Sequence, residues 1–180
     1  MSIHYNYLIV DERNATLWVR SRASATPRVA LSSYRALQVA YPSKSLYLLE
    51  SDEDLSTGTE TAVRYVLPYA QACEDGHEGP AAVVEVWHRS ELSVESYFSK
   101  ETPSDLKRAE FIQVAAVLAP AESALSCAYE LTQNIDANWC PLKPMRSSMP
   151  GDVLVLRAPG EEEQIWVVKA IGWARAASFA

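Results

Sequence analysis

The sequence predicts an α+β protein, with mostly antiparallel sheet and short helices packed on one face. Three observations favour this class. Short runs rich in β-branched and aromatic residues alternate with polar turn clusters, as in strands joined by tight turns. Helical periodicity is confined to short stretches bounded by proline. Apolar residues make up 48% of the 180-residue chain and charged residues 22%, which is typical of globular proteins.

The first half contains turn signals and apolar runs for four strands. The expected elements are, in order, a hairpin of strands over 4–11 and 15–20, a helix from Ser32 or Ser33 to before Pro42, a buried strand over 44–50, a helix from Thr59 that ends at Pro68, a surface loop over 71–80, a valine-rich strand over 81–87 and a short helix over 90–98.

The second half has fewer and clearer elements. The expected order is a strand over 111–118, a helix from Pro120 to Asn134, and an antiparallel hairpin of strands over 153–157 and 165–171 around an acidic loop. An apolar-free, proline-containing stretch over 99–105 is the best linker. It divides the chain into an N-terminal α+β region, 1–103, and a C-terminal β-α-β-β region, 104–180, and leaves open whether the two share one core.

Charge and composition exclude several classes of protein. The net charge of −7 disfavours non-specific binding to nucleic acid or to an anionic membrane. No apolar run approaches the length of a membrane span, and no signal-peptide pattern is present, so we expect a cytoplasmic protein. Three widely spaced cysteines and three scattered histidines predict neither a disulfide framework nor a metal site. No cofactor motif occurs.

Polar and aromatic residues concentrate between residues 132 and 173. Pro150, Gly151 and Asp152 precede a valine run and predict a turn that enters a strand. The preceding Arg-Ser-Ser can bind an anion or a partner through its guanidinium and hydroxyls. Alternatively, this loop is tied to the turn over 133–136 by hydrogen bonds or by an Arg146–Asp136 pair. The candidate binding residues are Asn134, Asp136, Arg146, Ser147, Ser148 and Asp152.

Other candidate sites are weaker. Trp139, Trp166 and Trp173 are expected in the core, with base stacking as the alternative. Cys140 has no histidine near it in sequence, and no catalytic motif occurs, so the sequence favours a protein that is not an enzyme. Four arginines near Trp18 can form a basic edge for a phosphate-bearing partner. They are Arg13, Arg20, Arg22 and Arg28.

The C-terminal third resembles a known family. YELTQNIDANW, RSSMPGDVLVL and WVVKAIGW are similar to the YodL-like domain of plasmid- and phage-associated proteins, which has an R-S-x-S-x-G-D-V core and a closing G-W or G-F. The chain departs from this core at Ser148, Met149 and Pro150. The resemblance implies a plasmid or phage setting and implies that Arg146, Ser147, Gly151 and Asp152 act together.

Taken together, the sequence predicts a non-enzymatic binding or regulatory accessory protein that acts through protein–protein contacts. The alternative is a nucleic-acid-binding module that uses the Arg13–Arg28 edge and exposed tryptophans.

Overall fold

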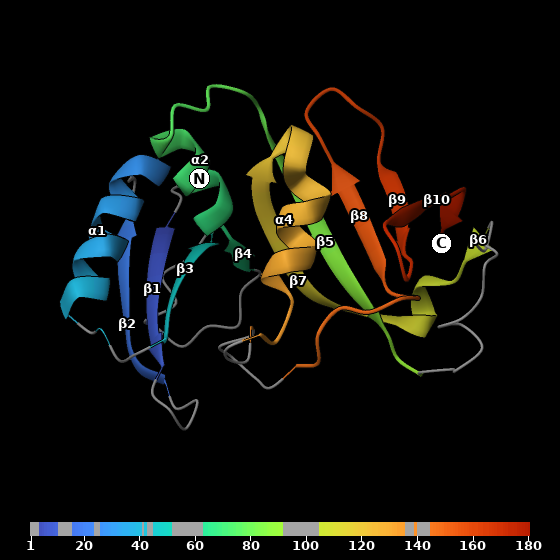
Figure 1. Cartoon of the computed structure of the whole chain (residues 1–180), viewed down its shortest axis with the longest axis horizontal. Coiled ribbons are helices and arrows are strands. Elements are labelled where there is room, and N and C mark those ends of the chain that lie inside the picture. Colours follow the sequence, from blue (N-terminus) through green and yellow to red (C-terminus); the bar gives the residue numbers. More distant parts are fainter. Residues whose placement is uncertain are drawn as a thin grey trace.

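A computed structural model of the chain describes residues 4–10, 16–23, 26–40, 42, 45–51, 63–91, 105–135, 139 and 145–180. Most of these residues belong to one large sheet and its covering elements (Figure 1). The strands are β1 (His4–Val10), β2 (Thr16–Ala23), β3 (Ser45–Ser51), β4 (Val63–Tyr65), β5 (Ala81–Arg89), β6 (Asp105–Leu106), β7 (Phe111–Pro120), β8 (Val153–Arg157), β9 (Gln164–Val168), β10 (Trp173–Ala176) and β11 (Ser178–Phe179). The helices are α1 (Pro27–Ala40), α2 (Leu67–Glu74) and α4 (Ala124–Leu131), with 3-10 turns η2 (Arg108–Glu110) and η3 (Ala121–Ser123).

The large sheet has nine strands in the order β10-β9-β8-β5-β7-β4-β3-β1-β2. Within it the β4–β7 pair is parallel and the other pairs are antiparallel. The predicted α+β class with a mostly antiparallel sheet is therefore confirmed. The two predicted hairpins, β1–β2 and β8–β9, are also present.

The central strands bury one face against α4. Buried and half-buried residues alternate along β5, as expected for a strand whose side chains point to opposite faces. Ala82, Val84 and Val86 of this strand meet Ala124 and Ala128 of α4. Small residues on both sides allow the helix to lie close across β5 and β7 (Figure 1).

The helices are distributed over both faces of the sheet rather than over one. We call the buried cluster that includes Ala124 and Ala128 the α4-side core, and Leu49 and Val117 belong to it. Their sequence neighbours Leu48 and Leu118 instead pack with α1 and α2. Since successive strand residues face opposite ways, α1 and α2 cover the face away from α4. Toward β8 and β9, that same face is covered by Phe179 of β11 and Leu106 of β6.

The predicted helix over 59–67 is wrong where the structure describes it. Residues 63–65 form β4, and α2 begins at Leu67 and occupies part of the expected loop over 71–80. Pro68 lies in the first turn of α2, where its missing N–H leaves no helical bond unmade, so it starts a helix rather than ending one. The first helix likewise begins at Pro27, upstream of the expected Ser32 or Ser33.

The sheet crosses the expected boundary between the two regions. β5, from the first region, lies between β7 and β8 of the second, and the α4-side core draws on both. Residues 92–98 of the expected helix over 90–98, and residues 99–104 of the linker, lie outside the described residues. Where the chain is described, it has no helix long and apolar enough to cross a membrane.

Candidate functional site

The candidate binding residues gather where two loops meet beneath the C-terminal end of α4. One loop follows this helix over 132–135, and the other, over 145–152, leads into β8. In Figure 1 the orange segment before β8 runs past the lower end of α4. Backbone groups join the loops directly, because the Ser148 N–H donates to the carbonyl of Thr132 at 3.0 Å.

Side chains of Gln133, Asn134 and Ser147 add further bonds between these loops. The Asn134 N–H donates to Ser147 Oγ at 2.8 Å, and Asn134 Nδ2 donates to the carbonyl of Met145 at 2.8 Å. Gln133 Nε2 donates to the carbonyl of Ser148 at 3.1 Å. Asn134 and Ser147 therefore hold the loops together in the way the structural alternative expects.

Asp152 is the centre of a second set of contacts. Arg146 donates from Nη1 to one carboxylate oxygen and from Nη2 to the other, each at 2.6 Å. The backbone N–H groups of Met149 and Arg89 each donate to the carboxylate at 2.9 Å. A bidentate guanidinium is the strongest common partner of a buried carboxylate, and here Asp152 is only 1% exposed. Arg146 pairs with Asp152, and the alternative partner Asp136 lies outside the described residues.

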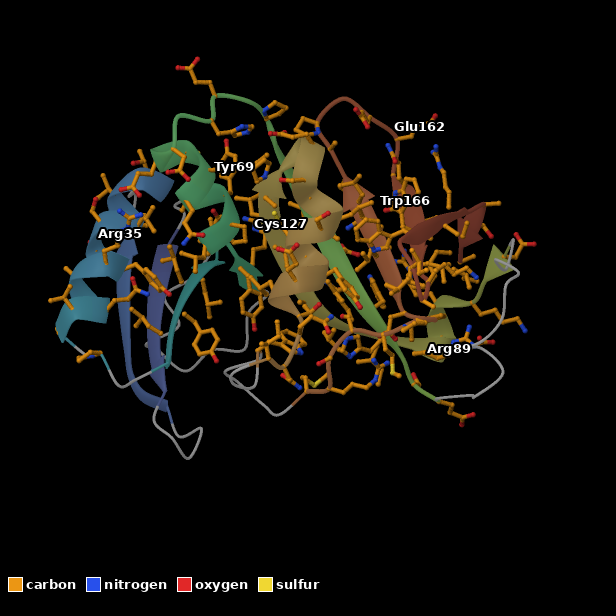
Figure 2. All side chains as sticks on the ribbon, viewed as in Figure 1. Arg35, Tyr69, Arg89, Cys127, Glu162 and Trp166 are labelled. Carbon is orange, nitrogen blue, oxygen red and sulfur yellow. The ribbon has the colours of Figure 1, made fainter. Side chains whose placement is uncertain are left out.

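Arg146 also ties the loop to β5. Its Nη2 donates to the carbonyl of Arg89 at 3.4 Å, and its Nη1 donates to the carbonyl of Ser147 at 2.9 Å. Figure 2 shows Arg89 at the lower end of β5, on the side of the molecule where these loops lie. The carbonyl of Arg146 in turn accepts a bond from the indole Nε1 of Trp139 at 2.9 Å.

His88 completes the cluster and was not predicted. Its Nε2 lies 3.0 Å from Ser148 Oγ, which lies 2.8 Å from Thr132 Oγ1, and the Thr132 hydroxyl donates to the carbonyl of Ala128 at 2.9 Å. Each hydroxyl has one proton to donate, and the Thr132 proton goes to Ala128. Ser148 therefore donates to Thr132, and the hydrogen bonds run in one direction from His88 through Ser148 and Thr132 to the end of α4. In this chain Nε2 carries the proton and donates to Ser148.

Burial keeps His88 uncharged. The side chain is 4% exposed, and this burial lowers the pKa of His88 from 6.5 to about 4. The nearby charge of Asp152 raises the pKa and that of Arg146 lowers it, both by less than burial does. His88 is therefore neutral at pH 7.

The serine, histidine and aspartate do not form a catalytic triad. Ser148 Oγ and Asp152 Oδ2 face the same ring nitrogen, Nε2, at 3.0 and 3.8 Å. A triad needs the carboxylate on the other nitrogen, so that the first can take the serine proton. Ser148 is also 2% exposed, beyond the reach of a substrate. The arrangement can brace two loops and a strand, but it does not activate a nucleophile.

A signal for His88 was present in the sequence. Ala82, Val84, Val86 and His88 recur every second residue, and all four are buried. A histidine at the buried positions of a strand needs a polar partner from another element. The sequence did not show that the partner would be Ser148, because 60 residues separate the two.

The remaining predicted residues divide into two groups. Trp139 is buried in the α4-side core, and Trp166 and Trp173 are half-buried against it, which agrees with the expected core role. The basic edge falls largely outside the described part of the chain. Arg13 is not among the described residues. The backbone is described at Trp18, Arg20, Arg22 and Arg28, but their side chains are not. The described residues contain no group of three or more acidic, histidine or cysteine side chains placed to hold a metal ion.

Comparisons add no relative, because no protein-family model, no curated protein and no solved structure matches the chain.

Proposed function

We propose that the protein is a non-enzymatic binding or regulatory protein that acts through protein–protein contacts, of the accessory type carried by plasmids and phages. One observation carries the proposal. Ile135 and Ile171 are 81% and 94% exposed, and both are displayed on loops at the end of the sheet that the Arg146–Asp152 cluster braces. We call this surface the loop end, defined by residues 132–135, 145–152 and 169–172.

Hydrogen bonds place these loops at one end of the sheet. The first two loops are joined through Ser148 and Asn134, as described above. The third follows β9, where the Val168 N–H donates to the carbonyl of Asp152 at 2.8 Å and the Gly151 N–H donates to the carbonyl of Val168 at 2.9 Å. The three loops are therefore linked through a continuous set of backbone contacts.

The hydrogen bonds between these loops favour a docking surface. A single exposed isoleucine is ordinary on a protein surface. Two exposed isoleucines on hydrogen-bonded loops offer a partner apolar contacts. Because the backbone of these loops is already held in place, binding costs less conformational entropy. The polar motif has a structural part in this surface, because Nη1 and Nη2 of Arg146 already donate to Asp152 and to backbone carbonyls.

The test is a differential capture experiment. The purified protein would be immobilised, exposed to an extract of cells that carry its gene, and the retained proteins would be quantified by mass spectrometry. The variant pair is Ile135→Ser and Ile171→Ser, alone and together. Val39→Ser is the matched control, since Val39 is 82% exposed but lies on α1.

We expect a protein whose recovery falls by about tenfold or more in the double variant, since anchor side chains at an interface each contribute about 1–2 kcal/mol. Recovery should be unchanged with Val39→Ser. Equal recovery by all variants, or equal loss with the control, would rule out the loop end as the binding surface. Loss of the captured material after nuclease treatment, with a gel shift at low salt, would instead favour the nucleic-acid-binding module.

A further inference from the structure

A different surface carries the further inference: the free edge of the sheet at β10. This strand is the last of the nine and pairs with β9 alone. No other strand in the described ranges lies beside its outer edge, and Figure 1 shows it at the end of the row after β8 and β9. An unpaired edge presents backbone N–H and C=O groups that another strand can bond.

A hydrogen bond at the β9–β10 turn fixes which backbone groups of β10 point outward. The Lys169 N–H donates to the carbonyl of Gly172 at 3.0 Å across the β9–β10 turn, so residues 169 and 172 form a bonded pair. Bonded and non-bonded pairs alternate along an antiparallel ladder. In the observed register, Ala174 and Ala176 therefore bond to β9, whereas the N–H and C=O groups of Trp173 and Arg175 point away from it.

The β8 side of β9 gives the same answer. The Val168 N–H donates to the backbone carbonyl of Asp152, in the loop that leads into β8, so Val168 bonds toward β8 and Val167 bonds toward β10. Val167 is the partner of Ala174. The outward assignment of Trp173 and Arg175 therefore follows from both neighbours of β9.

The side chains of these two residues share a face. Trp173 is held by Tyr129 of α4, with ring centroids 6.4 Å apart at 84°. Arg175 is exposed and lies across the ladder from Trp166, which Figure 2 shows on β9. An arginine and a tryptophan two residues apart are able to pair with each other when two such strands meet in opposite directions.

We propose that the β10 edge pairs with the same edge of a second copy of this chain, antiparallel and centred on Ala174. In this register Trp173 lies opposite the second copy's Arg175, and Arg175 lies opposite the second copy's Trp173. The outward groups of these residues form four backbone hydrogen bonds, related by a twofold axis. Each arginine meets a tryptophan face, and the sheet continues from one copy into the next.

Neighbouring registers are less favourable. Centring the pair on Arg175 places like charges directly opposite each other, which is destabilising. Centring it on Trp173 sets Arg175 against Ile171, which lies in the turn before Gly172. The Ala174 register is the one in which both outward residues of each copy find a complementary partner.

The proposed interface is small, so we expect the fraction of dimer to depend on protein concentration. Sedimentation velocity of the full chain, over roughly a hundredfold range reaching the millimolar range, should show a monomer–dimer equilibrium, as small interfaces give. Arg175→Pro removes one outward N–H per copy and spares the bonds to β9, and proline is tolerated where an edge N–H faces outward. Loss of two of the four bonds should weaken dimerisation by at least about thirtyfold. Arg175→Ala keeps the N–H and should weaken it by only about fivefold, the contribution of the arginine–tryptophan contacts.

Amide exchange of the unmodified chain provides a backbone readout that does not depend on the variant folding. The Ala174 amide should be protected at every concentration, because it bonds to β9. The Trp173 and Arg175 amides should exchange freely in dilute solution and become protected as the dimer forms.

Three results would overturn the proposal. The first is a chain that sediments as a monomer throughout the range. The second is a dimer in which the Trp173 and Arg175 amides stay unprotected, which places the contact elsewhere. The third is protection of these amides in dilute solution, which would mean that another part of the same chain covers the edge.

Discussion

At the scale of a single residue, Asp152 shows how hydrogen bonds stabilise a buried charge. Its carboxylate accepts four donors, from the two terminal nitrogens of Arg146 and from the N–H groups of Met149 and Arg89. Removing one partner of such a pair is costly because the remaining charge stays buried. The two backbone donors lie on different segments, so the aspartate also fixes the loop against the end of β5.

Replacing Arg146 should therefore destabilise the protein strongly. We expect Arg146→Ala to lower the free energy of unfolding by about 3 kcal/mol, the effect of breaking a buried pair. Arg35→Ala is the control, because Arg35 forms an exposed pair with Glu74, and such pairs contribute about 1 kcal/mol or less. Urea denaturation at neutral pH measures both. Equal losses for the two variants would contradict a structural role for the Arg146–Asp152 pair.

His88 makes a prediction about pH. Its folded pKa of about 4 lies below its ordinary 6.5, so the unfolded chain binds a proton at a higher pH than the folded chain does. Stability should be unaffected by this group above pH 6.5, fall as the pH drops from 6.5 to 4, and be lower by about 3 kcal/mol at the end of that window.

The pH effect can be isolated by comparing histidines. Urea denaturation at several pH values should show a smaller loss between pH 6.5 and 4 for His88→Gln than for the unmodified chain. His77→Gln should keep the loss, since His77 lies elsewhere and pairs with Glu122. A His88 ring that titrates near 6.5 in an NMR experiment would contradict the assignment.

At the scale of elements, local patterns predicted strands better than helices. β5 and β8 were predicted nearly to their ends, because valine-rich runs bounded by turn residues have few alternatives. Pro68 was misread because proline has two roles, as a residue that stops one helix and as one that begins another. Only the packing of Val66 and Ala70 with Leu48 decides in favour of α2.

The same scale explains what was missed at the candidate site. Loop residues such as Asn134 and Ser147 were found from their polar types and positions. His88 was not, because the hydrogen bond to Ser148 requires β5 and the loop before β8 to be neighbours, and this depends on strand order. Strand β10 was not predicted. The expected strand over 165–171 was too long, because β9 ends at Val168 and the chain then turns at Gly172, which has a positive φ.

At the scale of the whole molecule, one sheet joins the two regions that the sequence separates. β5 is bonded to β7 on one side and to β8 on the other, and β4 is bonded to β7. Residues of both regions also share the α4-side core. Removing either region would expose strand edges and apolar side chains of the other.

We therefore expect a single cooperative unfolding transition. Calorimetry should give equal calorimetric and van't Hoff enthalpies, as for a single domain. Leu154→Ala, at a fully buried position of β8, should cost about 3 kcal/mol and raise the exchange rates of the most protected amides of β3 as well as those of β8. Two separate transitions, or an effect confined to β8, would show that the regions unfold independently.

The sequence by itself determined the α+β class, the two hairpins, most strand positions and the loop residues around Arg146 and Asp152. These follow from local physics, namely the period of apolar residues and the backbone preferences of proline, glycine and asparagine. Only the tertiary structure decided the strand order, the division of helices between two faces, the contact of His88 with Ser148 and the place of β10 at the edge of the described sheet. Each of these depends on contacts between residues distant in sequence, which no local pattern specifies.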